Sequence, residues 1–286
     1  MLRPLNRILQ SSFWMAFLLL SSFHQSFAQD SIPNPPSDSS RFKLLGHIQG
    51  EFQYFTTDKL QQCYAISPTN ELIKYNREGK ELFRYNNNWL GELAIVDATN
   101  PFNLFLYYPE YMTVITLDRT LNETSTYNFF DLDLTDVQAA GMSNDNNIWL
   151  YDNIRFTLKK IDRQGNVLLE SNNLNLAIGH SIDPNFLVER NNQVYLNDPE
   201  LGILVFDNFA NYLHTLPLKS LRHFQVGEYL LSFQQNQQFL QYDLRSLLTY
   251  QRPGPIRLQQ AQQVRLQDNC FYLSDAKGLW IYTQTP

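Results

Sequence analysis

Residues 147–169 read Asn-Ile-Trp-Leu-Tyr-Asp-Asn-Ile-Arg-Phe-Thr-Leu-Lys-Lys-Ile-Asp-Arg-Gln-Gly-Asn-Val-Leu-Leu. This stretch decides the fold, because it predicts a strand, a loop, a second strand, a tight turn and a third strand. Residues 148–150 favour β structure, residues 158–161 combine apolar and basic side chains, and Gly165 supplies the positive φ that the turn needs. One such unit cannot bury its own apolar faces, so further copies are expected.

Variants of the unit recur about every 40 residues, each with an apolar strand that ends in Asp or Asn. The equivalent end positions are Asn76, Asp118, Asp162, Asp207 and Asp243. The last copy, residues 270–282, lacks its outermost strand, whereas residues 42–48 provide a spare strand. The sequence therefore predicts an all-β fold, a six-bladed β-propeller closed by an N-terminal strand that completes the last blade. A β-sandwich is the alternative, but it gives no reason for a repeat of this period.

The first apolar run of each copy is predicted to be the inner strand of a blade. These runs are residues 63–66, 104–107, 148–150, 194–196, 229–233 and 270–273. The connectors that follow the inner strands should then converge on one face of the disc.

The copies resemble NHL and related six-bladed propeller repeats, in which an inner strand ending near Asp is followed by a strand, an Asp-x-x-Gly turn and an outer strand. The resemblance covers residues 41–286. Gly79 and Gly165 keep the turn glycine, whereas the turns after Asp118 and Asp243 have none. Such a resemblance implies a propeller but no particular activity.

The first 28 residues are predicted to be a signal peptide. Arg3 and Arg7 precede an apolar segment at 13–23, and Ser26-Phe27-Ala28 ends in a small residue at the expected cleavage site. The apolar run is too short to span a membrane, and no second one follows, so we expect no transmembrane segment in the mature chain. Export would place the protein in the periplasm or at the cell surface. Gln29 directly after Ala28 resembles exported proteins of Bacteroidota.

Residues 29–40 are rich in Pro, Ser and Asp and almost lack apolar side chains, so they are predicted to be a disordered tether. The remaining residues, 41–286, suffice for the propeller. The formal net charge is −6, only 17% of residues are charged, and the longest basic run is Lys159-Lys160. Because nucleic acid binding requires clustered Lys and Arg, we expect no nucleic acid partner.

The sequence contains no local catalytic motif. His47, His180, His214 and His223 lack the partners at i+2 or i+4 that would present two nitrogens to one metal ion. No nucleophile elbow, zinc-protease helix or phosphate-binding glycine loop occurs. These observations favour a non-enzymatic protein without a cofactor.

One alternative is a calcium-dependent hydrolase. Six-bladed lactonases resemble this architecture, and they gather Glu, Asn and Asp side chains from several blades around calcium in the central channel. Residues of this kind follow the predicted inner strands at Asn70, Asp152, Asn153, Asn197, Asp198 and Asp275. Oxygen ligands suit calcium, but Asn and Asp are also the usual turn residues, because their side chains bond the local backbone. Under this alternative Ca²⁺ would be the cofactor.

The residues that follow the second predicted inner strand are unusually aromatic. Tyr107, Tyr108, Tyr111 and Met112 lie there, and the equivalent loop of the next blade contains Arg155 and Phe156. These residue types are enriched at protein interfaces, although aromatic side chains also pack between blades. The main hypothesis is a scaffold or accessory of cell-envelope machinery that binds a protein partner through this face. It is similar in kind to propellers of the Tol system and of outer-membrane barrel assembly, and a secretion accessory is one form of it.

Cys63 and Cys270 lie at equivalent positions of the first and last copies. Export permits a disulfide. However, equivalent strands of adjacent blades should be farther apart than the ~7 Å limit between the Cα atoms of bonded cysteines. The main prediction is therefore two buried thiols that pack as small apolar side chains.

Overall fold

The computed structural model describes residues 41–285, which belong to one compact unit. The predicted signal peptide, 1–28, and tether, 29–40, lie outside the described residues. None of the helices in residues 41–285 has the length and apolar character of a membrane span.

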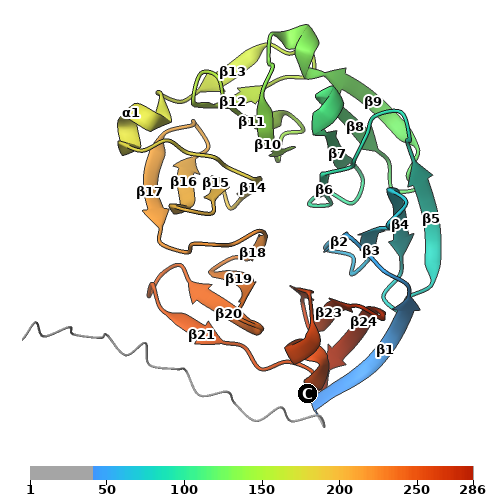
Figure 1. Cartoon of the computed structure of the whole chain (residues 1–286). Coiled ribbons are helices and arrows are strands. Elements are labelled where there is room, and N and C mark those ends of the chain that lie inside the picture. The colour runs from blue at the N-terminus through green and yellow to red at the C-terminus, as the bar shows by residue number, and fades with distance from the viewer. Residues whose placement is uncertain (1–40, 286) are drawn as a thin grey trace, which may run out of the picture. The chain divides into compact units, whose positions relative to one another are not determined.

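The described residues form six antiparallel sheets of four strands, arranged as blades around a central channel (Figure 1). Blade 1 contains β2 (Tyr54–Thr57), β3 (Cys63–Ile66), β4 (Glu71–Tyr75) and β5 (Glu81–Asn86). Blade 2 contains β6 (Ile95–Asp97), β7 (Leu104–Tyr108), β8 (Thr113–Leu117) and β9 (Glu123–Asn128). Blade 3 contains β10 (Val137–Met142), β11 (Ile148–Asp152), β12 (Thr157–Ile161) and β13 (Val167–Glu170).

The other three blades continue the same order. Blade 4 contains β14 (Phe186–Arg190), β15 (Gln193–Asp198), β16 (Gly202–Asp207) and β17 (Tyr212–Leu216). Blade 5 contains β18 (Phe224–Val226), β19 (Leu230–Gln235), β20 (Gln238–Asp243) and β21 (Thr249–Gln251). Blade 6 contains β22 (Gln263–Gln267), β23 (Cys270–Asp275), β24 (Gly278–Gln284) and, from the other end, β1 (Phe42–Gln49). The prediction of a six-bladed β-propeller is confirmed.

Four short helical segments lie in the turns and connectors. They are η2 (Pro109–Tyr111), η3 (Phe129–Leu132), α1 (Leu174–Ile178) and η4 (Ile256–Gln260). Helix α1 is capped at its N-terminus by Asn173, whose side chain accepts a hydrogen bond from the Leu176 amide, and at its C-terminus by Gly179, which has a φ of 78°.

Strand β1 closes the ring by pairing with β24, so that Phe42 lies opposite Gln284 and Gln49 opposite Gly278 (Figure 1). The rings of His47 and Trp280 stack with their centroids 3.5 Å apart. The Arg257 guanidinium also lies 3.5 Å from the centroid of the Trp280 ring. The last blade is therefore completed by the N-terminal strand, as the spare strand at 42–48 predicts.

In every blade, the strand that was predicted to be innermost is the second strand, so this prediction is wrong. The apolar runs that begin at Cys63, Leu104 and Ile148 are the second strands, and the innermost strands are β2, β6, β10, β14, β18 and β22. A second strand is covered on both faces by neighbouring blades, which explains its continuous apolar run. The innermost strands are as short as three residues and carry too little alternation to be recognised.

The Asn and Asp residues that define the repeat each open the hairpin between the third and fourth strands. Oδ1 of Asp118, for example, accepts hydrogen bonds from the amides of Thr120 (2.7 Å) and Asn122 (2.9 Å). Equivalent bonds are made by Asn76, Asp162 and Asp207. Asp243 opens a turn that is one residue longer, and its Oδ1 accepts from the amides of Arg245 and Ser246. The fourth residue of the turn has a positive φ, at Gly79 and Gly165 but also at Leu121 (63°). The repeat is thus a hydrogen-bonded turn that tolerates the loss of its glycine.

The core lies between blades, and alternate residues of each second strand face opposite neighbours. In β7, Leu106 and Tyr108 pack with blade 1, whereas Phe105 and Tyr107 pack with blade 3. Cys63 and Cys270 are free, buried thiols in the cluster between blades 6 and 1. The prediction of two unpaired buried thiols is confirmed.

Candidate functional site

The candidate partner-binding and metal-ligating residues lie at or near the turns of one face of the disc. Because the strands of a blade are antiparallel, turns from second to third strands emerge on the same face as the connectors from each fourth strand to the next blade. We call this the connector face. The turns from first to second and from third to fourth strands form the opposite face.

Three of the predicted partner-binding residues belong to the core. Tyr107 and Tyr108 are fully buried, and Met112 is nearly so. The Tyr107 hydroxyl donates a hydrogen bond to the Val137 carbonyl (2.7 Å) and lies 3.2 Å from the Met112 sulfur. Burial raises the pKa of Tyr108 to about 12. Tyr107 and Tyr108 lie in β7, a second strand that neighbouring blades cover on both faces. All three side chains are therefore part of the core and not of the exposed surface.

The other three predicted partner-binding residues reach the surface. Tyr111 and Arg155 are exposed, and Phe156 is half-buried against the core between blades 3 and 4. Phe156 has a φ of 57°, which turns the chain from β11 into β12. The interface hypothesis thus retains Tyr111, Arg155 and the outer edge of Phe156.

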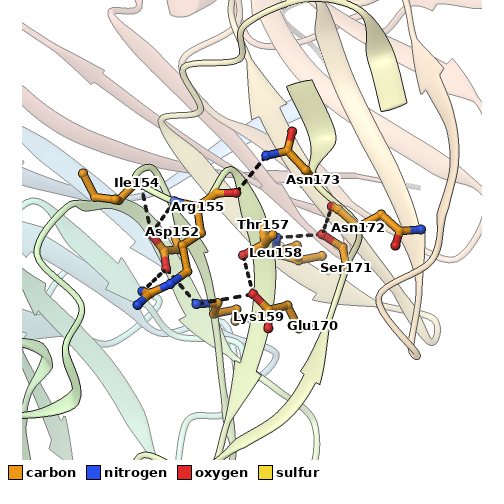
Figure 2. A network of polar contacts seen from close by, with 10 residues as sticks. All are labelled: Asp152, Ile154, Arg155, Thr157, Leu158, Lys159, Glu170, Ser171, Asn172 and Asn173. Atoms are coloured by element: carbon orange, nitrogen blue, oxygen red, sulfur yellow. Dashed lines mark hydrogen bonds and ion pairs between the residues drawn. The ribbon is translucent and has the colours of Figure 1, made fainter. Parts of the chain in front are cut away.

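Asp152 is the centre of a polar network in blade 3 (Figure 2). Its Oδ1 accepts hydrogen bonds from the amides of Ile154 and Arg155, both 3.0 Å. Its Oδ2 accepts from Lys159 Nζ (2.7 Å) and from the Arg155 guanidinium (3.0 Å). Burial opposes ionisation of Asp152, but these hydrogen bonds hold its pKa below the usual value. Both carboxylate oxygens are therefore engaged by protein donors.

The other candidate metal ligands also bond protein groups, except that the buried Oδ1 atoms of Asn153 and Asn197 have no hydrogen-bond partner among the described residues. The Asp198 carboxylate accepts hydrogen bonds from the amides of Glu200, Leu201 and Asp183. The Asp275 carboxylate accepts hydrogen bonds from the amides of Lys277 and Gly278 and from the Arg257 guanidinium (3.1 Å). The Asn70 side chain bonds the backbone of Gly91 and Leu93. The side-chain amide of Asn153 donates to the Asp136 carboxylate. The side-chain amide of Asn197 donates to the Asn185 side chain and to the Leu221 carbonyl. Within residues 41–285, no three His, Cys, Asp or Glu side chains are grouped to hold a metal ion. The carboxylates of Asp152, Asp198 and Asp275 are therefore engaged by protein donors, as turn residues commonly are.

Sequence reasoning missed a row of exposed apolar side chains on the connector face. Trp89 and Leu176 are 87% and 85% exposed, and three others are at least half exposed. The row consists of Trp89, Tyr111, Phe130, Ile154 and Leu176. We call these five residues the hydrophobic arc. It runs over blades 1 to 4.

Contacts between neighbouring turns and connectors join successive members of the arc. The loop after Trp89 reaches the next turn, where Gly91 lies directly against the Glu110 side chain beside Tyr111. The Asn128 amide donates to the Tyr111 carbonyl (3.4 Å) and its Oδ1 accepts from the Phe130 amide (2.8 Å). These bonds place Phe130 beside Tyr111.

The second half of the arc is joined in the same manner. The amide of Asn153 donates to the carbonyl of Asp136 (3.0 Å), which links the connector after Phe130 to the turn that holds Ile154. The Asn173 side chain donates to the Arg155 carbonyl (3.1 Å) and caps the helix that presents Leu176. The arc is therefore held on linked turns rather than on separate loops.

Two cavities lie along the channel, of about 590 and 750 Å³. The smaller one is lined in part by turns of the opposite face, including Lys59, Thr99 and Asp268. The larger one opens towards the connector face. Both cavities are lined by Tyr54, Phe224, Gln225, Ser232 and Arg265, so the two cavities adjoin.

Comparison with known proteins supports the fold. No known family and no curated protein matches the sequence. Among solved structures, the chain is similar to the Neurospora crassa Pan2 WD40 domain, with 10% identity, a TM-score of 0.61, and 87% of this chain and 97% of that chain covered. It is also similar to a virginiamycin B lyase from Staphylococcus aureus, with 9% identity, a TM-score of 0.59, and 85% and 100% covered.

A third similar structure is the extracellular domain of a hybrid two-component system from B. thetaiotaomicron. The identity is 13%, the TM-score is 0.50, and the match covers 77% of this chain and 32% of that chain. At these identities the likenesses show the propeller fold and nothing finer.

Proposed function

We propose that this protein is a non-enzymatic, exported scaffold of the cell envelope that binds a protein partner through the hydrophobic arc. The observation that carries this proposal is the gathering of five large apolar side chains on linked turns of one face. An exposed apolar row of this kind marks an interaction surface. Burying a side chain of this size against a partner contributes about 1.5–3 kcal/mol.

Export and the envelope setting come from the sequence. The predicted signal peptide and tether and the likeness to exported proteins of Bacteroidota support a periplasmic or cell-surface protein. An accessory role in secretion or envelope assembly fits a propeller that presents one apolar face. We expect no nucleic acid partner, because charged residues are sparse, and no cofactor, because protein donors engage the carboxylates of Asp152, Asp198 and Asp275.

The test is to recover partners from the native envelope by cross-linking and affinity purification. The arc variant combines Trp89→Ser, Ile154→Ser and Leu176→Ser. The matched control combines Phe209→Ser and Leu247→Ser, which are similarly exposed but lie in turns of the opposite face. We expect a stoichiometric envelope partner that the arc variant binds at least about tenfold more weakly and that the control retains.

Two results would overturn the proposal. One is a partner that the arc variant retains at full affinity. The other is a wild-type protein that brings down no stoichiometric partner from its own envelope.

A further inference from the structure

The charged side chains that line the larger channel cavity are all positive. Its volume is about 750 Å³, within the range of small-molecule sites. It lies between the inner strands of blades 5, 6 and 1 and is bordered by the connectors around Gln53, Arg222 and Gln262. Arg222 and Arg265 contribute positive charge, and no Asp or Glu occurs among the described residues that line it. The acidic protein thus contains a cavity that favours anions.

Neither arginine forms an ion pair with a carboxylate, although Arg265 also lines the smaller cavity, whose lining includes Asp97. None of the ion pairs of the described residues includes Arg222 or Arg265. Arg265 is half-buried on β22, and its Nε donates to Thr57 Oγ1 at 3.3 Å. The two terminal nitrogens of its guanidinium have no hydrogen-bond acceptor among the described residues. A half-buried guanidinium without a counter-ion is costly, unless a ligand supplies one.

His223 lines the same cavity and lies near both arginines. Its ring packs against Tyr54, with centroids 4.8 Å apart, and Phe186, with centroids 5.7 Å apart. Its buried Nδ1 has no hydrogen-bond partner among the described residues. Burial, followed by repulsion from Arg265 and Arg222, lowers the pKa of His223 to about 4. A third polar group near the two arginines therefore lacks a partner.

Amide side chains supply hydrogen-bond donors and acceptors around the arginines. Gln225 and Gln263 are committed, because each bonds the backbone of a neighbouring inner strand, at Leu266 and Phe55. The side chains of Gln53, Gln237 and Gln262 line the rim and form no hydrogen bond within residues 41–285. Free amides at a cavity rim suit a ligand with several hydroxyl groups.

We propose that this cavity binds a small hydroxylated anion, a sugar acid or sugar phosphate, whose anionic group is held by Arg265 and Arg222 and whose hydroxyls bond Gln53, Gln237 and Gln262. Guanidinium groups bind carboxylate and phosphate by paired hydrogen bonds. The site is separate from the hydrophobic arc, so it does not depend on the proposed protein partner.

The test is isothermal titration of the purified propeller with three probes. D-glucuronate and glucose 6-phosphate carry the two anionic groups, and glucose is the neutral match. We expect at least one anion to bind with one-to-one stoichiometry and at least about tenfold more tightly than glucose, and the stronger of the two identifies the preferred group. If neither anion binds better than glucose, the proposal is overturned.

Variants assign the binding to the two arginines. Arg265→Gln and Arg222→Gln should each weaken binding of the preferred anion at least about tenfold. Arg84→Gln is the control, because Arg84 is an arginine paired with Glu71 and Glu81 on the outer strand of blade 1, and it should bind as the wild type does. Arg222 is exposed, so its variant tests the site even if Arg265→Gln impairs folding. Full-strength binding in both cavity variants would overturn the proposal.

Discussion

At the scale of single residues, the chain places an ion pair in a buried strand. Lys159 lies in β12, yet its side chain is only 5% exposed and reaches Asp152, which is 2% exposed, at 2.7 Å. Arg155 bonds the same carboxylate from solvent and is 53% exposed. A buried cation and an exposed cation thus bond the same carboxylate (Figure 2). Replacing each one in turn compares the contributions of a buried and a surface ion pair to stability.

We expect Lys159→Met to lower the free energy of unfolding by about 3 kcal/mol, because it leaves the buried Asp152 carboxylate short of a counter-ion. Arg155→Met is the matched control and should cost about 1 kcal/mol or less, since surface pairs contribute little. Urea denaturation measures both. Equal losses in the two variants would contradict this account.

At the scale of the element, the turn between third and fourth strands is the repeated device of the fold. Hydrogen bonds from the Asn122 backbone and the Thr120 hydroxyl lower the pKa of Asp118 from 3.8 to about 2. The pKa values of Asp162, Asp207 and Asp243, at equivalent turns, are lowered too. For Asp207 burial acts in the opposite direction, and the hydrogen bonds from Asn211 and Phe209 outweigh it. These four turns are therefore held by an ionised carboxylate, whereas Asn76 serves in blade 1.

The sign of the pH dependence follows from these lowered pKa values. The turns stabilise the folded state fully above pH 3.8, and this contribution is lost as the pH falls towards about 2. Asp118→Asn should keep the turn, as Asn76 does in blade 1, but it should show a smaller fall in Tm between pH 4 and pH 2. Thermal unfolding followed across this range is the measurement. An unchanged pH profile in Asp118→Asn would refute the role of its ionisation.

At the scale of the whole molecule, the ring is closed by strands from opposite ends of the described chain. β1 must pass close to the β4–β5 turn of blade 1 while it pairs with β24. Gly46 makes this approach possible, because a Cβ at that position would lie 2.3 Å from the Glu78 carbonyl oxygen. The closing strand therefore depends on a missing side chain rather than on an unusual φ.

We expect Gly46→Ala to displace β1 and lower stability by about 1–3 kcal/mol, as other overpacked sites do. Gly227→Ala is the control, because the nearest atom to its Cβ would be the Leu230 carbonyl oxygen at 3.2 Å. Hydrogen exchange should show faster exchange at β1 and β24 in Gly46→Ala and not in the control. Unchanged protection of β1 would rule out this closing contact.

The sequence by itself determined the architecture, because that information is local. The Asx turn forms between residues two and four apart, so Asn76, Asp118 and their equivalents mark the repeat in one dimension. The spare strand at 42–48 and the unfinished last copy likewise predicted the closure. The turns of Asp152, Asp198 and Asp275 were foreseen as one of two interpretations, for the same local reason.

Only the tertiary structure decided which side chains are available for function. Tyr107 and Tyr108 look like interface residues in sequence, but a second strand is covered on both faces, and both are buried. Trp89 and Leu176 lie in connectors without periodic pattern, and their common face exists only once the blades are arranged in a ring. Arg222 and Arg265 meet around one cavity because blades 5 and 6 are neighbours, and Gln53 joins them from the far end of the chain. Proximity of this kind depends on how whole blades pack beside one another, which the pattern within a single blade does not encode.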